Sequence, residues 1–325
     1  MEHYLDNAAT TKPCAEAAAA VMSCISSHYG NPSSLHRKGL EAQHEVEYAR
    51  NQVAGALGCK AQEIVFTSGA TESTNLALCG AAAAYGRKRK KIITSAVEHA
   101  SVRETMAHLE TLGFTVVSVP PAEDGLYHAE DFLKEVDKDT CMVSIMLVNN
   151  ENGYRMPVEE VFRTVKRRDP DIITHCDAVQ GFLKVSFKPR TLCADLVSLS
   201  GHKVHALKGA GALYIRQGVR LKSVLYGSRQ EKGLRPGTEG VPVIAAFGAA
   251  AEKLVLTMDE RYDAVSGLRS SLIEQLKEMD GVIIRDLPSA SPYVLNISLL
   301  GYRSEIVLHY LEQREVYISS GSACS

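Results

Sequence analysis

The segment DLVSLSGHK, residues 195–203, runs from an apolar stretch into a lysine. Its first five residues predict a buried strand, and the glycine-containing stretch 209–215 predicts a second strand after a short loop. A lysine at the end of a buried strand is a candidate imine-forming amine, because burial beside cationic or polar groups favours the deprotonated, nucleophilic form. The alternative for Lys203 is an ordinary lysine of a surface loop.

Two further predicted strands lead into residues that could bind parts of a cofactor. The strand 171–176 leads into Asp177, whose carboxylate can pair with a protonated pyridine nitrogen or can simply cap a helix. The strand 63–67 leads into SGATESTN, residues 68–75, before a predicted helix that extends to Tyr85. A turn of this kind suits a phosphate, although any capped helix has a similar composition. The three elements together predict a cofactor cleft, and pyridoxal phosphate is the cofactor that most often uses such a lysine.

Six motifs in order along the chain strengthen this interpretation. They are TSGATES (67–73), EH (98–99), VNNENG (148–153), DAVQ (177–180), SGHK (200–203) and SSGSAC (319–324). They closely resemble those of the group I cysteine desulfurases, which are pyridoxal-phosphate enzymes of aminotransferase class V. The similarity begins at YLDNAATT, residues 4–11, and continues to the last residue. It implies an α/β fold of type I, with a mostly parallel central sheet, helices on both faces and a smaller α+β domain.

The resemblance implies roles for the residues around the cofactor ring. Lys203 is expected to bind the cofactor covalently and then to move the α proton of the substrate. Asp177 is expected to keep the pyridine nitrogen protonated, and His99 to stack on the ring and relay protons. Asn150 and Gln180 resemble the partners of the ring hydroxyl or of the lysine linkage, and the sequence leaves open which of them contacts the oxygen.

The resemblance also implies a phosphate site and a dimer. Thr71, Ser200 and His202 are expected to bind the phosphate together with the backbone N–H of Ala70. In the family, a hydroxyl equivalent to that of Thr238 comes from the neighbouring subunit, which implies a homodimer; the alternative for Thr238 is a turn residue.

Cys324 lies in a Gly/Ser-rich stretch and is the candidate sulfur nucleophile. The resemblance implies that its thiolate attacks the sulfur of L-cysteine, which leaves a persulfide on Cys324 and releases L-alanine. The sulfur would then pass to an acceptor protein, for example an iron-sulfur scaffold. The alternatives are a selenocysteine lyase and a truncated, non-catalytic scaffold that binds the cofactor and needs a partner chain.

One departure from the family concerns the substrate carboxylate. Family members continue beyond the active-site cysteine and include there an arginine that binds this carboxylate, whereas the sequence given ends at Ser325. The resemblance therefore implies weak substrate binding for this chain. Arg235 and Arg303 are available as substitutes, and the sequence does not choose between them.

Composition sets the remaining expectations. The 325 residues are 45% hydrophobic and 23% charged, which suits a large domain of residues 16–257 and a small domain of residues 1–15 and 258–325. A helical segment from Val241 is predicted to run through Met258 to Met279. The net charge of -2 argues against a general nucleic-acid binder.

The compartment is expected to be the cytoplasm, with no membrane partner. The sequence has no 18-residue apolar stretch and does not start with a signal sequence. Its eight cysteines include no C-x-x-C pair, which predicts reduced thiols and no metal site.

Overall fold

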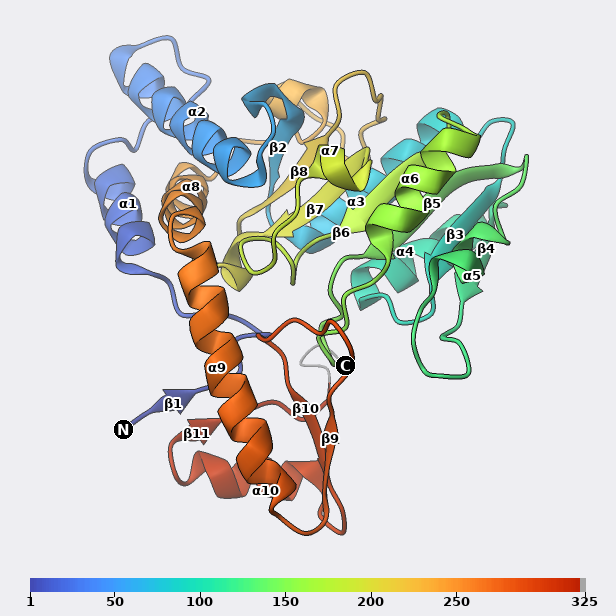
Figure 1. The fold of residues 1–325 in the computed structure, drawn as a ribbon. Coiled ribbons are helices and arrows are strands. Elements are labelled where there is room, and N and C mark those ends of the chain that lie inside the picture. Colours follow the sequence, from blue (N-terminus) through green and yellow to red (C-terminus); the bar gives the residue numbers. More distant parts are fainter. Residues whose placement is uncertain (322–325) are drawn as a thin grey trace.

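A seven-stranded sheet forms the centre of the computed structural model, which describes residues 1–321 (Figure 1). The strand order is β2-β8-β7-β6-β5-β3-β4. The strands are β2 (Ile64–Thr67), β3 (Lys91–Ser95), β4 (Thr115–Val119), β5 (Thr140–Met146), β6 (Ile173–Asp177), β7 (Leu196–Ser200) and β8 (Gly211–Ile215). Strand β8 runs antiparallel to β2 and β7, and the other neighbouring pairs are parallel. The predicted mostly parallel α/β sheet is therefore confirmed.

Helices cover both faces of this sheet. They are α1 (Ala15–Ser26), α2 (Arg37–Leu57), α3 (Ala70–Tyr85), α4 (Ala100–Thr111), α5 (Ala129–Leu133), α6 (Val158–Arg168), α7 (Pro189–Leu192) and α8 (Val241–Val255). One hydrophobic core lies between the sheet and α3 and α4, and a larger core lies on the opposite face beneath α6 and α8. Successive residues of a strand pack into opposite cores, because their side chains point to alternate faces of the sheet; Met142 and Val143 are an example.

A smaller unit is built from the two ends of the chain. It contains α9 (Met258–Lys277), β9 (Val282–Arg285), β10 (Asn296–Leu299) and α10 (Ser304–Glu312), and β1 (His3–Tyr4) pairs in parallel with β11 (Val316–Tyr317). Strands β9 and β10 pair antiparallel. Figure 1 shows α9 leading away from α8 towards these short strands.

The expectation of one helical segment from Val241 to Met279 is wrong. Helices α8 and α9 are separate and meet at an angle of 74°. The break exposes a backbone carbonyl at the end of α8, and Arg261 Nη2 donates to this Leu254 oxygen at 2.8 Å. No single helix within residues 1–321 has the length and apolar character needed to cross a membrane; α8 and α9 meet that test only as a bent pair.

Candidate functional site

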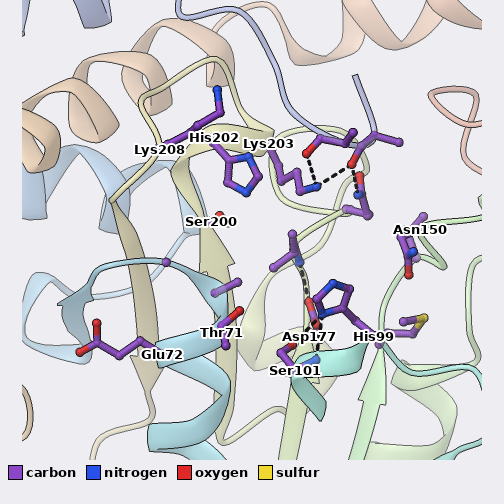
Figure 2. A pocket seen from close by; sticks show the side chains of 18 of the residues that line it. Thr71, Glu72, His99, Ser101, Asn150, Asp177, Ser200, His202, Lys203 and Lys208 are labelled. Carbon is purple, nitrogen blue, oxygen red and sulfur yellow. Dashed lines mark hydrogen bonds between the residues drawn. The ribbon is translucent and has the colours of Figure 1, made fainter. Parts of the chain in front are cut away.

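A cleft of about 420 Å³ opens at the carboxyl ends of the parallel strands, where α/β sheets collect their ligands. The predicted site residues that line it are Ala70, Thr71, His99, Asn150, Asp177, Gln180, Ser200, His202 and Lys203. They come from the ends of five different strands or from the connections that follow them. Figure 2 shows the side chains of Thr71, His99, Asp177, His202 and Lys203 around one space. Ser319 and Gly321 near the end of the described chain also line this cleft.

Lys203 ends the short 3-10 helix η2 (Gly201–Lys203), which directly follows β7. The residue is only 9% exposed. Its Nζ donates hydrogen bonds to the carbonyl oxygens of Ala8 and Ala9, each at 2.6 Å (Figure 2). The N-terminal segment therefore holds the amine at the cleft through backbone atoms.

Asp177 and His99 occupy the middle of the cleft. Asp177 ends β6, and its Oδ1 accepts the N–H of Val179 at 3.0 Å. Burial raises the pKa of Asp177, and the charges of His99 and Lys203 act in the opposite direction. A further cation beside this carboxylate, such as a protonated pyridine nitrogen, would offset the cost of its burial.

His99 is the N-cap of α4, and this role fixes its tautomer. Nδ1 of the ring accepts the backbone N–H of Ser101 at 3.1 Å. Because an accepting nitrogen has no proton, the neutral ring has its proton on Nε2. The ring lies beside Asp177 in Figure 2, where Nε2–H is a donor for the cleft.

A second group of residues forms a cup suited to an anion. Helix α3 starts at the cleft, and its N-cap Gly69 provides no side chain for the first N–H groups. The hydroxyl oxygen of Ser200 is buried and makes no hydrogen bond within residues 1–321. A Cβ on Gly211 would lie 2.6 Å from the Gly69 backbone, so only glycine lets β8 approach this turn. Burial, followed by the charge of Lys203, lowers the pKa of His202 to about 4, so this ring is neutral.

Pyridoxal phosphate fits these residues. The uncapped helix start and the partnerless Ser200 hydroxyl suit its phosphate, and the buried Asp177 suits its pyridine nitrogen. Lys203 lies in the same cleft as the amine for its aldehyde.

Gln180 is fixed by two hydrogen bonds. Its Nε2 donates to the Ala8 oxygen at 2.8 Å, and its Oε1 accepts from Lys184 Nζ at 2.9 Å. Asn150 also lines the cleft, and it follows the bridge residue Val148 by two positions.

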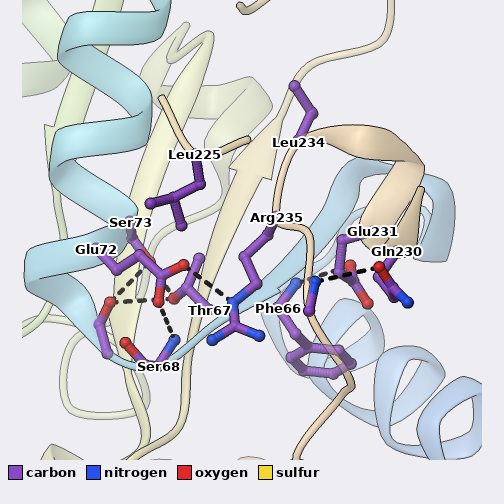
Figure 3. Close-up of polar contacts among 12 residues, drawn as sticks. Phe66, Thr67, Ser68, Glu72, Ser73, Leu225, Gln230, Glu231, Leu234 and Arg235 are labelled. Atoms are coloured by element: carbon purple, nitrogen blue, oxygen red, sulfur yellow. Dashed lines mark hydrogen bonds and ion pairs between the residues drawn. The ribbon is translucent and has the colours of Figure 1, made fainter. Parts of the chain in front are cut away.

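Thr238 and the two candidate arginines lie apart from this group. Thr238 is exposed and does not line the cleft of its own chain. Arg235 Nε bonds Glu72 Oε1 at 3.0 Å, so its guanidinium already has a carboxylate partner (Figure 3). Arg303 directly precedes α10 and is not among the lining residues.

Cys324 lies outside the described residues, and the seven cysteines within them form no disulfide.

Three features of the site escaped the sequence analysis. The Ala8 and Ala9 carbonyls lie in the quoted motif YLDNAATT, but nothing there assigns them to Lys203. Glu98 is buried next to His99; Ser95 Oγ and Met146 N donate to its Oε1 at 2.6 and 2.9 Å. Burial raises its pKa to about 8. The third feature is Lys184, whose spacing of four from Gln180 was the available signal.

Comparison with known proteins agrees with this geometry. The aminotransferase class-V family model matches residues 3–325. "Cysteine desulfurase IscS" of Dictyoglomus turgidum is 39% identical over 326 residues, which cover 100% of this chain and 82% of that protein. "Cysteine desulfurase" of Nostoc sp. is 40% identical, with 99% of this chain and 80% of that protein covered. A solved structure of a "NifS-like protein" superposes with a TM-score of 0.95 at 39% identity, covering 98% of this chain and 88% of the other. The chain therefore belongs to aminotransferase class V and, within it, to the cysteine desulfurases.

Proposed function

We propose that this cleft binds pyridoxal phosphate and converts L-cysteine to L-alanine, with transfer of the sulfur to Cys324. The observation behind the proposal is the meeting of Lys203, Asp177 and His99 with an uncapped helix start in one cleft. A solved relative, 32% identical with a TM-score of 0.82, is described as "SspA in complex with cysteine" and covers 99% of this chain and 90% of that chain. The selenocysteine lyase alternative is not favoured, because the reported relatives are named cysteine desulfurases.

The phosphate would be held by the N–H groups of Ala70 and Thr71, the Thr71 and Ser200 hydroxyls and the His202 ring. Because the Ser200 hydroxyl is buried and has no hydrogen-bond partner among residues 1–321, a phosphate oxygen would satisfy it. His202 is neutral and its Nδ1 contacts Thr10 Oγ1 at 3.1 Å. The neutral ring adds a polar contact there without bringing a charge into the cup.

The reacting end of the cofactor would lie between Lys203, Asp177 and His99. When bound, pyridoxal phosphate supplies an electron sink for negative charge at the α carbon of an amino acid. Asp177 would stabilise a protonated pyridine nitrogen, and His99 would lie against the ring and offer its Nε2–H as a donor. Gln180 and Asn150 would serve as polar partners of the ring hydroxyl or of the lysine linkage. Lys203 would hold the cofactor through its aldehyde, and its amine, once free, would accept the α proton of the substrate.

Cys324 completes the sulfur chemistry. Its thiolate attacks the sulfur of L-cysteine; a sulfur-sulfur bond forms as the carbon-sulfur bond breaks, and the bonding electrons return to the β carbon. Protonation of that carbon gives L-alanine, and the persulfide sulfur then passes to an acceptor protein. Ser319 and Gly321 line the cleft, and Cys324 follows Gly321 by three positions in the sequence.

The decisive variant is Cys324→Ala, with Cys79→Ala as the matched control because Cys79 lies on α3, away from the residues that line the cleft. Purified proteins are incubated with pyridoxal phosphate and L-cysteine, and alanine and protein persulfide are quantified. We expect Cys324→Ala to bind both molecules but to form neither product, while the control matches the unmodified protein. Equal alanine formation by Cys324→Ala would exclude the persulfide route in favour of simple lyase chemistry.

The assembly is part of the same proposal. Thr238 is exposed on the segment that Arg235 tethers to Glu72, so it is available to the phosphate site of a second subunit in a homodimer (Figure 3). We place the large domain at residues 16–257 and the small domain at residues 1–15 and 258–325, with the protein in the cytoplasm. Sedimentation of the purified protein tests the dimer, and Thr238→Ala should weaken cofactor binding if the hydroxyl reaches the partner's site.

A further inference from the structure

Lys184 is a buried lysine that the proposed reaction does not use. The residue is 7% exposed, and among residues 1–321 its Nζ is paired with the neutral Gln180 amide and not with a carboxylate. Burial, followed by the charges of Lys203 and Arg261, lowers its pKa to about 7. Burying a lysine without a carboxylate partner is unfavourable, and methionine fills a similar space without that cost. Packing alone therefore does not explain why a lysine occupies this position.

The hydrogen bonds of Lys184 lead to the catalytic amine in three steps. Lys184 Nζ donates to Gln180 Oε1 at 2.9 Å, and Gln180 Nε2 donates to the Ala8 oxygen at 2.8 Å. The same Ala8 oxygen accepts from Lys203 Nζ at 2.6 Å. Gln180 is itself only 5% exposed, so water does not replace these contacts freely.

These contacts permit one orientation of the Gln180 amide. A lysine amine donates to the carbonyl oxygen, and the Ala8 oxygen can only accept, so a flipped amide would lose both bonds. The amide nitrogen has a second hydrogen beyond the one used by Ala8. Gln180 lines the cleft, and the fixed orientation makes it a hydrogen-bond donor there.

The backbone around Lys184 is shaped to hold this arrangement. Leu183 has a φ of 58°, in the left-handed region that a leucine rarely adopts. Arg261 Nη2, from α9, donates to the Leu183 oxygen at 3.2 Å. This turn therefore places Lys184 Nζ within hydrogen-bond distance of Gln180 Oε1.

We propose that Lys184 is a positioning residue for cofactor binding: it fixes the Gln180 amide so that this amide holds the Ala8 carbonyl and presents an N–H to the cofactor. The inference rests on the proposed function, because it assumes that pyridoxal phosphate occupies the cleft. Lys184 acts through Gln180 and does not itself touch the cofactor.

The test is a double-mutant cycle on cofactor affinity. Cofactor-free protein is titrated with pyridoxal phosphate, and the dissociation constant and absorption maximum are recorded for Lys184→Met, Gln180→Ala and the double variant. Lys188→Met is the matched control, because it makes the same change at an exposed lysine of the same segment. Lys184→Arg keeps a donor at the position. Thermal unfolding shows whether each variant is folded.

We expect Lys184→Met to weaken cofactor binding about fivefold, the net effect of one ordinary hydrogen bond, and Lys188→Met to leave it unchanged. In the Gln180→Ala background, Lys184→Met should cause no further loss. Lys184→Arg should keep the affinity and the absorption maximum of the unmodified protein.

Three results would overturn the inference while the proposed function stands. The first is an affinity of Lys184→Met for pyridoxal phosphate equal to that of the control. The second is that Lys184→Met lowers the affinity equally in the presence and in the absence of the Gln180 side chain. The third is that Lys184→Arg lowers the affinity as much as Lys184→Met does. If the unmodified protein binds no pyridoxal phosphate, the proposed function fails and this inference fails with it.

Discussion

Replacement of Glu98 by glutamine tests whether the carboxyl group that directly precedes His99 in the sequence is neutral. Glu98 Oε1 accepts two hydrogen bonds, while its Oε2 is buried and makes none within residues 1–321. Burial is the main cause of its raised pKa of about 8, and the charge of Asp177 contributes in the same direction. The side chain is thus a neutral acid near pH 7, and Glu98→Gln changes its shape little.

The expected effect is a change in the pH dependence of stability. The unfolded chain releases this proton near the ordinary value of 4.5, whereas the folded protein holds it until about 8. The folded state therefore binds more protons in this window, and its stability is fully present below pH 4.5 and falls as pH rises towards 8. At about 1.4 kcal/mol per pH unit, the loss between about pH 5 and pH 8 is on the order of 3 kcal/mol.

Urea unfolding of the cofactor-free protein between pH 5 and 8 measures this effect as a difference. Glu98→Gln has no proton to release, so its stability relative to the unmodified protein should rise by about 3 kcal/mol over that range. The contributions of other titrating groups cancel in the difference. Glu110→Gln, at an exposed glutamate of the C-terminal part of α4, is the control and should show no such trend.

Two results would refute the reasoning. A difference that stays constant to within about 1 kcal/mol across this range would mean that Glu98 titrates alike in both states. A difference of the opposite sign would mean that the folded protein stabilises the carboxylate, so that its hydrogen bonds from Ser95 and Met146 outweigh its burial.

Three further variants test the cofactor site. Lys203→Ala should abolish the cofactor that borohydride fixes to the protein, and an unchanged fixed fraction would rule out this lysine. Asp177→Asn should retain cofactor yet slow deuterium exchange at the substrate α carbon greatly, because an amide does not stabilise the pyridinium; near-normal exchange would count against that role. Ser200→Ala should weaken cofactor binding about tenfold or more without lowering the stability of the cofactor-free protein, because the hydroxyl has no hydrogen-bond partner within the described part of the chain; an unchanged affinity would remove Ser200 from the proposed phosphate site.

The sequence by itself determined the sheet and the position of the cleft. Apolar runs followed by Asp177, Lys203 and the turn at 68–75 mark the carboxyl ends of strands, and parallel strands bring those ends to one edge. The residues named from that pattern meet because the backbone geometry of a parallel sheet leaves few other arrangements. Helix α3 likewise extends from Ala70 to Tyr85, where an alanine-rich stretch favours helix.

Only the tertiary structure decided which groups are buried and which distant atoms meet. The Ala8 carbonyl reaches Lys203 across 195 positions of sequence, and no local pattern encodes such a contact. In the sequence, Glu98 and Lys184 look like ordinary charged residues. In the folded protein both are buried, and the loss of hydration shifts their pKa values. The break between α8 and α9 is likewise absent from the sequence pattern: the helical pattern continues through it, whereas in the structure the two helices meet at 74° and Arg261 donates to the carbonyl oxygens of Leu183 and Leu254.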